Sequence, residues 1–401
     1  MADLDIQAVR SKFPAFQEDQ VFLDNAGGSQ TLGVVIDTIR DYLIKSNVQF
    51  GGGYKASQAS SSRYNDGVEA GAKFLNARKD EIAYGSSTTQ LLRNLSFTFP
   101  FQEGDEIVVS AIDHEANIAP WKDLASRLKL TIKWWKPQDS STTNPKLVPE
   151  DLSSLLTPKT RLVTCTHASN VLGTVHDVKA IAAAVHAAVP GALVCVDGVA
   201  YAPHRPVDVR ALGVDFYVLS WYKVFGPHVA MLFAGRAAQG RMASLGHFFN
   251  PHDTLEQKIS LGSGYYELVA AIPPIVAYTG PPSSPEWAAV LSQESALQSK
   301  LLAYLNGHPD ITVYGETSAD AALRLPVVSF RVAGRDSREL VEALERTTRY
   351  GFRWGAFYSH ALVRDVLGLG ADGVVRVSMA HYNTVEEIEG FIKAIDKVIS
   401  K

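Results

Sequence analysis

The sequence predicts an α/β fold, in which helices cover a mostly parallel sheet and a smaller α+β domain follows at the C-terminal end. Short apolar segments alternate with helical stretches from about residue 80 to residue 235. Continuous apolar strands interleaved with helices are typical of a parallel sheet buried on both faces. The segment Pro281-Pro282-Ser283-Ser284-Pro285 then interrupts the chain, as a domain boundary does. We therefore expect a large domain over 17–280 and a small domain built from 1–16 and 281–401.

Six apolar segments of the large domain are the expected strands, at 106–110, 131–135, 161–166, 193–197, 216–220 and 230–233. Helical periodicity predicts helices around them at 87–98, 117–127, 177–188 and 207–212. In the small domain the same criteria predict a long helix over 287–306, strands at 327–332 and 374–378, and helices at 338–347 and 385–400.

The composition is that of an ordinary globular protein, with 401 residues, 46% hydrophobic and 20% charged. A net charge of −4 gives no electrostatic reason to expect a nucleic-acid or anionic-membrane partner. Neither a signal peptide nor an apolar run of membrane-spanning length is present, so we expect a cytoplasmic protein. The two cysteines, Cys165 and Cys195, lie in apolar strand segments and are expected to be free. No clustered Cys/His spacing suggests a metal site.

Lys223 and Asp197 are the most informative pair of residues. Asp197 ends one apolar strand, and Lys223 lies just past the next. This order suits a pyridoxal phosphate site, where a lysine forms the Schiff base and a carboxylate pairs with the pyridinium nitrogen. The alternatives are a solvated loop lysine, and an aspartate that caps a helix or pairs with Arg205. An unpaired carboxylate at the end of a buried strand is costly, which favours the cofactor interpretation.

Other polar residues also follow predicted strands, where ligands collect in an open parallel sheet. The turn Gly85-Ser86-Ser87-Thr88-Thr89-Gln90 opens a helix and could cradle a phosphate, or serve as an ordinary helix cap. His114 could stack on a planar ring, or be a surface imidazole in a capped turn. Asn170 could hydrogen-bond a phenolic oxygen, or belong to a plain Ser/Asn/Gly turn.

Several motifs in order resemble one family over about the whole chain. They are Phe22-Leu23-Asp24-Asn25-Ala26-Gly27, Asp113-His114-Glu115-Ala116-Asn117, Thr166-His167-Ala168-Ser169-Asn170, Val196-Asp197-Gly198, the stretch from Lys223 to Pro227, and Val375-Arg376-Val377-Ser378. Together they resemble the class V aminotransferases, in the cysteine desulfurase-like branch of fold-type I pyridoxal phosphate enzymes. Several motifs that occur in the order of a family identify that family more specifically than any single motif. The resemblance implies a large domain with a seven-stranded type of sheet, bound pyridoxal 5'-phosphate, and a homodimer with shared active sites.

The resemblance also implies roles for individual residues. Lys223 resembles the Schiff-base lysine, Asp197 the pyridinium partner, and His114 the ring-stacking histidine. Further cofactor contacts are implied for Asn170, Thr88 or Thr89, Ser220, Tyr222 and, from the partner subunit's side, Ser263. Arg376 resembles the arginine that binds the substrate α-carboxylate, for which a guanidinium is well suited. The remaining residues expected on the substrate side are Arg353, Trp354 and Tyr358.

Two departures from the family pattern bear on activity. Cysteine desulfurases use a cysteine nucleophile in the C-terminal domain, but here Tyr358 stands about where that thiol should be, and no cysteine follows Cys195. Tyrosine cannot accept a sulfur atom, so persulfide-forming desulfurase activity is excluded. Ala200 replaces the family's glutamine or histidine beside the cofactor, while Trp354 and Phe357 add bulk on the substrate side. These changes suggest a pocket rebuilt for another substrate.

The sequence thus predicts a pyridoxal phosphate enzyme that acts on an amino acid through a carbanion at Cα. We expect lyase- or cyclase-type chemistry in specialised or alkaloid metabolism, such as carbon–sulfur cleavage or a decarboxylating ring closure. Transamination and epimerisation are the alternatives, because the same carbanion leads to both. A non-catalytic scaffold is disfavoured since Lys223 and Asp197 both persist. A dehydrogenase is disfavoured because Gly51-Gly52-Gly53 follows no convincing strand.

Overall fold

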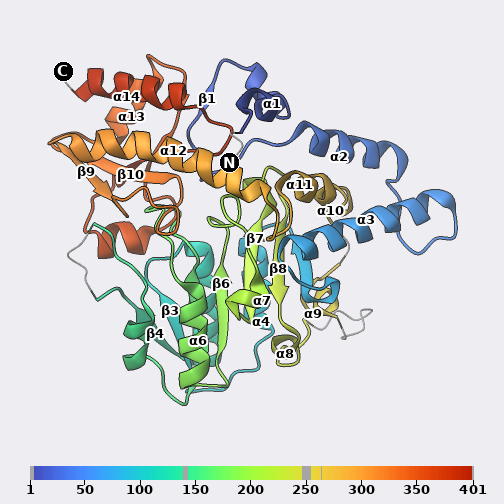
Figure 1. Ribbon diagram of the computed structural model, residues 1–401. Helices are drawn as coiled ribbons and strands as arrows, with labels where there is room; N and C mark the ends of the chain where they lie inside the picture. The colour runs from blue at the N-terminus through green and yellow to red at the C-terminus, as the bar shows by residue number, and fades with distance from the viewer. Residues whose placement is uncertain (1–3, 139–142, 246–253, 263, 400–401) are drawn as a thin grey trace.

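The computed structural model describes residues 4–138, 143–245, 254–262 and 264–399. Its main feature is a seven-stranded sheet in the order β2-β8-β7-β6-β5-β3-β4 (Figure 1). Strands β3 to β7 run parallel to one another, whereas β8 is antiparallel to both β2 and β7. The predicted α/β fold is confirmed. The strands are β2 (Ile82–Gly85), β3 (Glu106–Ser110), β4 (Thr131–Trp135), β5 (Thr160–Thr166), β6 (Leu193–Asp197), β7 (Phe216–Ser220) and β8 (Ala230–Ala234).

Helices cover both faces of this sheet because successive strand residues point to opposite sides. Val194 and Val196 of β6 belong to one core cluster, and Leu193 and Cys195 belong to another. The first face packs against α3 (Lys55–Phe74), α6 (Val178–Ala188), α7 (Val209–Leu212) and α11 (Ile272–Thr279). The second packs against α4 (Thr88–Phe97), α5 (Ala119–Leu128), α8 (Arg236–Gln239) and α9 (Leu255–Ile259).

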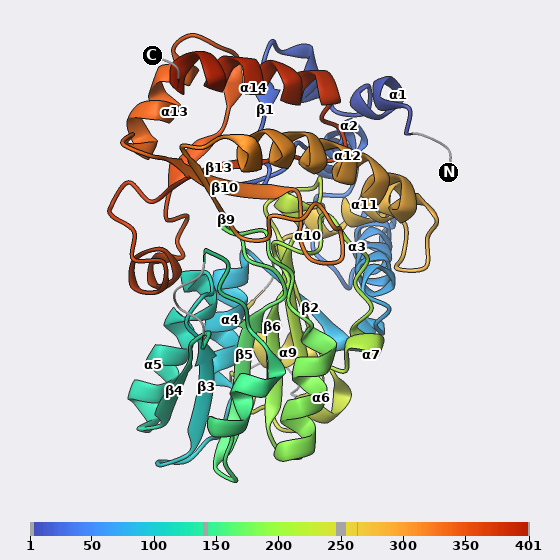
Figure 2. The same cartoon turned by 60° about the vertical axis from the view of Figure 1, so that its left-hand side comes forward.

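A second sheet of four antiparallel strands lies in the C-terminal part, in the order β12-β13-β10-β9. Its strands are β9 (Ile311–Tyr314), β10 (Val327–Val332), β12 (Arg353–Gly355) and β13 (Val374–Ser378). A separate core joins it to α12 (Glu286–Gly307), α13 (Ser337–Glu345) and α14 (Val385–Ile399), which lie beyond the large sheet (Figure 2). The division into two domains near residue 280 stays a prediction, because the core of the large sheet also takes in Trp287, Phe357 and Tyr382 from beyond that point.

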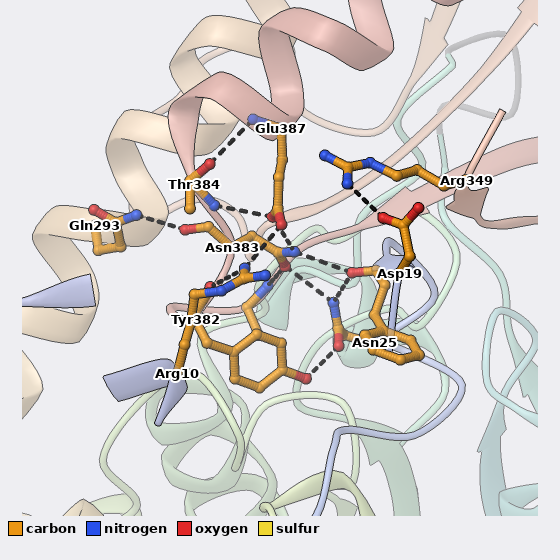
Figure 3. Close-up of polar contacts among 11 residues, drawn as sticks. Arg10, Asp19, Asn25, Gln293, Arg349, Tyr382, Asn383, Thr384 and Glu387 are labelled. Atoms are coloured by element: carbon orange, nitrogen blue, oxygen red, sulfur yellow. Dashed lines mark hydrogen bonds and ion pairs between the residues drawn. The ribbon is translucent and has the colours of Figure 1, made fainter. Parts of the chain in front are cut away.

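The N-terminal segment joins both parts of the molecule. Arg10, the last residue of α1 (Ile6–Arg10), forms an ion pair of 2.8 Å with Glu387 and donates to the Tyr382 carbonyl (Figure 3). Strand β1 (Val21–Phe22) pairs in parallel with β11 (Tyr350–Gly351). The Phe13 ring meets Tyr382 on one side and Phe225 of the large-sheet core on the other. This segment therefore packs against the C-terminal part, as expected, and against the large part as well.

Among the elements that were not anticipated are the edge strand β2 and the long helices α2 (Gly33–Lys45) and α3. The four residues of β2 are too few to stand out beside the hydroxyl-rich turn that follows them. Helix α3 is mostly polar and contains two buried glycines, Gly67 and Gly71, which weaken a helical signal. Helix α5 starts at Ala119, later than expected, because residues 115–117 form a separate 3-10 turn.

Candidate active site

A cavity lies at the carboxyl ends of β5, β6 and β7, where a parallel sheet offers a ligand site. Its volume is about 510 Å³, counting the open mouth. It is lined by Ser87, Thr88, Thr89, His114, Ala116, Thr166, Ala168, Asn170, Asp197, Val199, Ala200, Ser220, Tyr222 and Lys223. Eight predicted cofactor residues thus meet here from five separate stretches of the chain.

Lys223 lies in a 3-10 turn directly after β7 and is buried. Burial, assisted by the nearby Arg376 and opposed by Asp197, lowers the pKa of its ammonium group to about 8. With this pKa about one lysine in ten is neutral at pH 7, far more than for an ordinary lysine, and the neutral amine is the form that a nucleophile or general base requires. The solvated-loop alternative does not hold.

Asp197 ends β6 and is buried, and its Oδ1 accepts a hydrogen bond of 2.9 Å from the Val199 amide. Burial raises the pKa of its carboxyl group, while the Val199 bond and Lys223 lower it. Arg205, the alternative partner, instead binds Glu294 at 2.8 Å. Asp197 can therefore pair with a cationic group bound in the cavity, such as a pyridinium nitrogen.

The opposite end of the cavity is formed by the start of α4. Ser87 caps the helix by accepting from the Gln90 amide at 3.1 Å, and the Thr88 and Ser220 hydroxyls are 2.7 Å apart. First-turn amides and hydroxyls at a helix N-terminus make a site for a phosphate. The cap interpretation and the phosphate interpretation are thus compatible. Ser263 lies outside the described residues.

His114 and Asn170 line the cavity from two loops. The His114 Nδ1 accepts from the Ala116 amide at 3.0 Å, so the residue caps its turn and also faces the cavity. Burial, then Lys223 and Arg376, lower the pKa of this imidazole to about 4. Asn170 donates to the Phe357 carbonyl at 3.0 Å and accepts from the Ser359 hydroxyl at 2.9 Å. Its side chain therefore ties the cavity to the loop after β12.

Arg376 of β13 lies behind Asn170 and is almost fully buried. Its Nη1 donates to the Asn170 carbonyl at 3.0 Å, and its Nη2 is 2.7 Å from Asp24 Oδ1. Asp24 Oδ2 in turn lies 2.7 Å from Arg353 Nε, so one carboxylate joins both predicted substrate-side arginines. Arg376 Nε has no hydrogen-bond partner among the described residues. Asp24 was missed as a functional residue because its partners lie far along the chain.

Phe357 and Tyr358 lie in the loop that Asn170 contacts. The centroid of the Phe357 ring lies 3.7 Å from the Arg376 guanidinium carbon. The backbones of Phe357 and Tyr358 are both left-handed, with φ of 50° and 58°. The Tyr358 carbonyl accepts from the Glu115 amide at 2.8 Å, while its side chain is 65% exposed beside His114. Trp354, in contrast, packs against the C-terminal core and does not line the cavity.

The residues present fit pyridoxal phosphate. A helix N-terminus with two hydroxyls, a buried carboxylate and a buried lysine of lowered pKa face one cavity, and each matches one functional group of that cofactor. Among the described residues, no group of three His, Cys, Asp or Glu side chains could hold a metal ion.

The aminotransferase class-V family model matches residues 21–391. This chain belongs to that family. Its members are enzymes that depend on pyridoxal phosphate, so the cofactor predicted from the sequence is confirmed. None of the helices among the described residues is long and apolar enough to cross a membrane.

Among its curated relatives is the aminotransferase-like protein FGM3 of Gibberella zeae, 52% identical with 98% of each chain covered. The cysteine desulfurase-like protein ustD of Aspergillus flavus is 39% identical, covering 99% of this chain and 91% of the relative. The nonribosomal peptide synthetase-like enzyme fsqF of Aspergillus fumigatus is 42% identical over 98% of this chain, but only 26% of that protein is matched.

Solved cysteine desulfurases share the fold. CsdA of Escherichia coli has a TM-score of 0.85 at 24% identity, covering 100% of this chain and 99% of that chain. The apo enzyme from Thermococcus onnurineus has a TM-score of 0.87 at 23% identity, with 100% of each chain covered.

Proposed function

We propose that this protein is a lyase- or cyclase-type pyridoxal phosphate enzyme that breaks a bond at the Cα of an amino acid, without forming a persulfide. The observation that carries the proposal is the meeting of Lys223 and Asp197 in one buried cavity that no cysteine lines. When bound, the cofactor supplies an electron sink for negative charge developing at Cα. The alternatives, aminotransferase and epimerase, use the same residues.

The side chains divide the work by position. Asp197 would hold the pyridine nitrogen protonated, and Thr88 with Ser220 would hold the phosphate. Lys223, with a pKa of about 8, can take a proton from Cα and return it. Arg376 would orient the substrate carboxylate after Asp24 or the Phe357 ring moves aside, because both of them contact its guanidinium group.

Neither cysteine can replace a desulfurase thiol. Cys165 and Cys195 are fully buried in β5 and β6. Burial raises the pKa of both thiols, so the reactive thiolate is scarce. Tyr358 is exposed beside the cavity, but a phenol cannot carry a sulfur atom. This supports a reaction other than desulfuration.

Two further assignments belong to the proposal. A role in specialised metabolism is supported by the relative named a nonribosomal peptide synthetase-like enzyme, and cytoplasmic location stays a prediction. A homodimer is supported by α2, where four apolar side chains are about half exposed or more: Val34, Ile36, Leu43 and Ile44. A second copy of the chain is the partner we propose for this face, because an uncovered apolar helix is unfavourable in water.

The test is to record the visible spectrum of the purified protein and then incubate it with single amino acids in heavy water. We expect a chromophore that is absent in Lys223→Ala and present in Lys129→Ala, an exposed lysine outside the cavity. One class of amino acid should exchange its Cα hydrogen and give a cleaved or cyclised product. Transfer of the amino group to an added 2-oxo acid would instead establish the aminotransferase. Protein that binds no pyridoxal phosphate would refute the proposal.

A further inference from the structure

A second pocket lies at the β2 edge of the large sheet, among α3, α9 and α10 (Tyr266–Val269), and we call it the aromatic pocket (Figure 1). Its volume is about 750 Å³, counting the open mouth. Its lining includes four aromatic rings and one carboxylate, which belong to Phe50, Tyr64, Tyr265, Tyr266 and Glu256. Among the described residues, none lines both this pocket and the cavity that holds Lys223, so the two are distinct.

The aromatic rings form one connected group, and each of them is half-buried. Phe50 stacks on Tyr266 with ring centroids 3.9 Å apart, and the centroid of Tyr64 lies 5.1 Å from that of Phe50. The Tyr266 hydroxyl donates to Gln49 Oε1 at 3.1 Å, and the Tyr64 hydroxyl donates to Glu256 Oε1 at 2.6 Å. Because these hydroxyl groups already have acceptors, the tyrosines offer a ligand mainly the surface of their rings.

Glu256 is the charged residue of the lining that the structure describes. It is exposed in the first turn of α9, and none of the ion pairs among the described residues includes it. Arg63, which precedes a lining residue in the chain, pairs instead with Asp41 at 2.8 Å. Burial, and then the charge of Glu256, raise the pKa of Tyr84, a buried residue of the lining. The carboxylate thus acts on the interior of the pocket and has no basic side chain to balance it there.

This combination of groups favours a cation. The face of an aromatic ring carries negative potential and attracts an ammonium group within about 6 Å of its centroid. The carboxylate of Glu256 adds a full negative charge beside those rings and would repel an anion. An acidic residue in the first turn of a helix is favourable by itself, but that role does not require rings around it. We propose that the aromatic pocket binds a small organic ammonium cation, such as a methylated ammonium group on a short apolar stem.

The experiment titrates choline into the cofactor-containing protein by calorimetry, beside 3,3-dimethylbutan-1-ol, the neutral molecule of the same shape. A quaternary ammonium cannot form a Schiff base, so choline leaves the cofactor chemistry aside. We expect choline to bind about tenfold more tightly than the alcohol. Protonated 2-(dimethylamino)ethanol, which carries an N–H, then separates the two contributions. Tighter binding than choline would indicate a hydrogen bond to Glu256, and equal binding would indicate contact with the rings alone; both support the pocket.

Two variants remove one contribution each. Glu256→Gln removes the charge but keeps an acceptor for Tyr64, and it should weaken choline binding about tenfold. Glu267→Gln is its control, because Glu267 removes the same charge from the adjacent α10 without lining the pocket. Phe50→Leu removes a ring and should also weaken binding about tenfold, whereas Tyr54→Leu, at an exposed position outside the lining, should not. Should Phe50→Leu not fold, the exposed Glu256 still gives the test.

Three outcomes would overturn the inference. Choline binding that is unchanged in both Glu256→Gln and Phe50→Leu would place the cation elsewhere. Equal affinity for choline and the neutral alcohol would show that charge plays no part. Absence of binding by either cation at about 10 mM would leave the pocket without a ligand of this class. None of these measurements depends on Lys223 or on turnover of an amino acid, so failure of the proposed function can be told apart from failure here.

Discussion

Lys223→Met should stabilise the cofactor-free protein. The folded state lowers the pKa of Lys223 from 10.5 to about 8, chiefly by burial. Because one pKa unit is worth about 1.4 kcal/mol, holding the charged ammonium in the fold costs about 3 kcal/mol below pH 8. Methionine has a similar shape and no charge, so the variant avoids that cost. Burial of the Lys223 ammonium group therefore lowers the stability of the cofactor-free fold.

The sign of the pH dependence gives a sharper test. Between pH 8 and 10.5 the unfolded chain binds a proton at Lys223 that the folded chain has lost, so the stability of the natural protein rises over this range. The advantage of Lys223→Met should be full near pH 7 and should vanish above about pH 10.5. Thermal unfolding of both proteins without cofactor, at pH 7 and at pH 10.5, measures it. A variant that is less stable at pH 7, or whose advantage is the same at both pH values, would refute the reasoning.

Three other substitutions test the polar contacts. Asp197→Asn should still bind the cofactor but slow Cα hydrogen exchange at least about 100-fold, and an unchanged rate would exclude Asp197 as the pyridine partner. Asp24→Asn should lower stability by about 1–3 kcal/mol, because Arg376 is buried but the Asp24 side chain is 28% exposed. Glu294→Gln should cost more, about 3–5 kcal/mol, because Glu294 and Arg205 are both buried. Chemical denaturation that ranks the last two in the opposite order would contradict this account.

Local sequence patterns predicted the large sheet well. Strands such as β6 are continuously apolar, and their ends carry the predicted cofactor residues, so one pattern located both the fold and the position of Asp197. Lys223 and Asp197 could be paired from their order alone, because parallel strands end at the same edge. Helix α3 could not be found in this way, since its stability comes from packing against α11 and not from its own sequence.

The substrate side was harder to predict because it depends on contacts between distant parts of the chain. No local pattern indicates that Asp24 would lie between Arg353 and Arg376. Nor does a turn sequence reveal that Asn170 holds the Phe357 carbonyl. Trp354 could equally have faced the cavity or the C-terminal core, since neighbouring strand residues point to opposite sides.

The contact between Asp24 and Arg376 also constrains the order in which the molecule can be assembled. The two residues are 352 positions apart, and β1 must wait for β11 to emerge before it can pair. During synthesis the N-terminal segment therefore leaves the ribosome first and finds its place last. A nascent chain that ends before β13 lacks Arg376, the guanidinium that we propose for the substrate carboxylate. On that assignment, the substrate site is incomplete until β13 has been made.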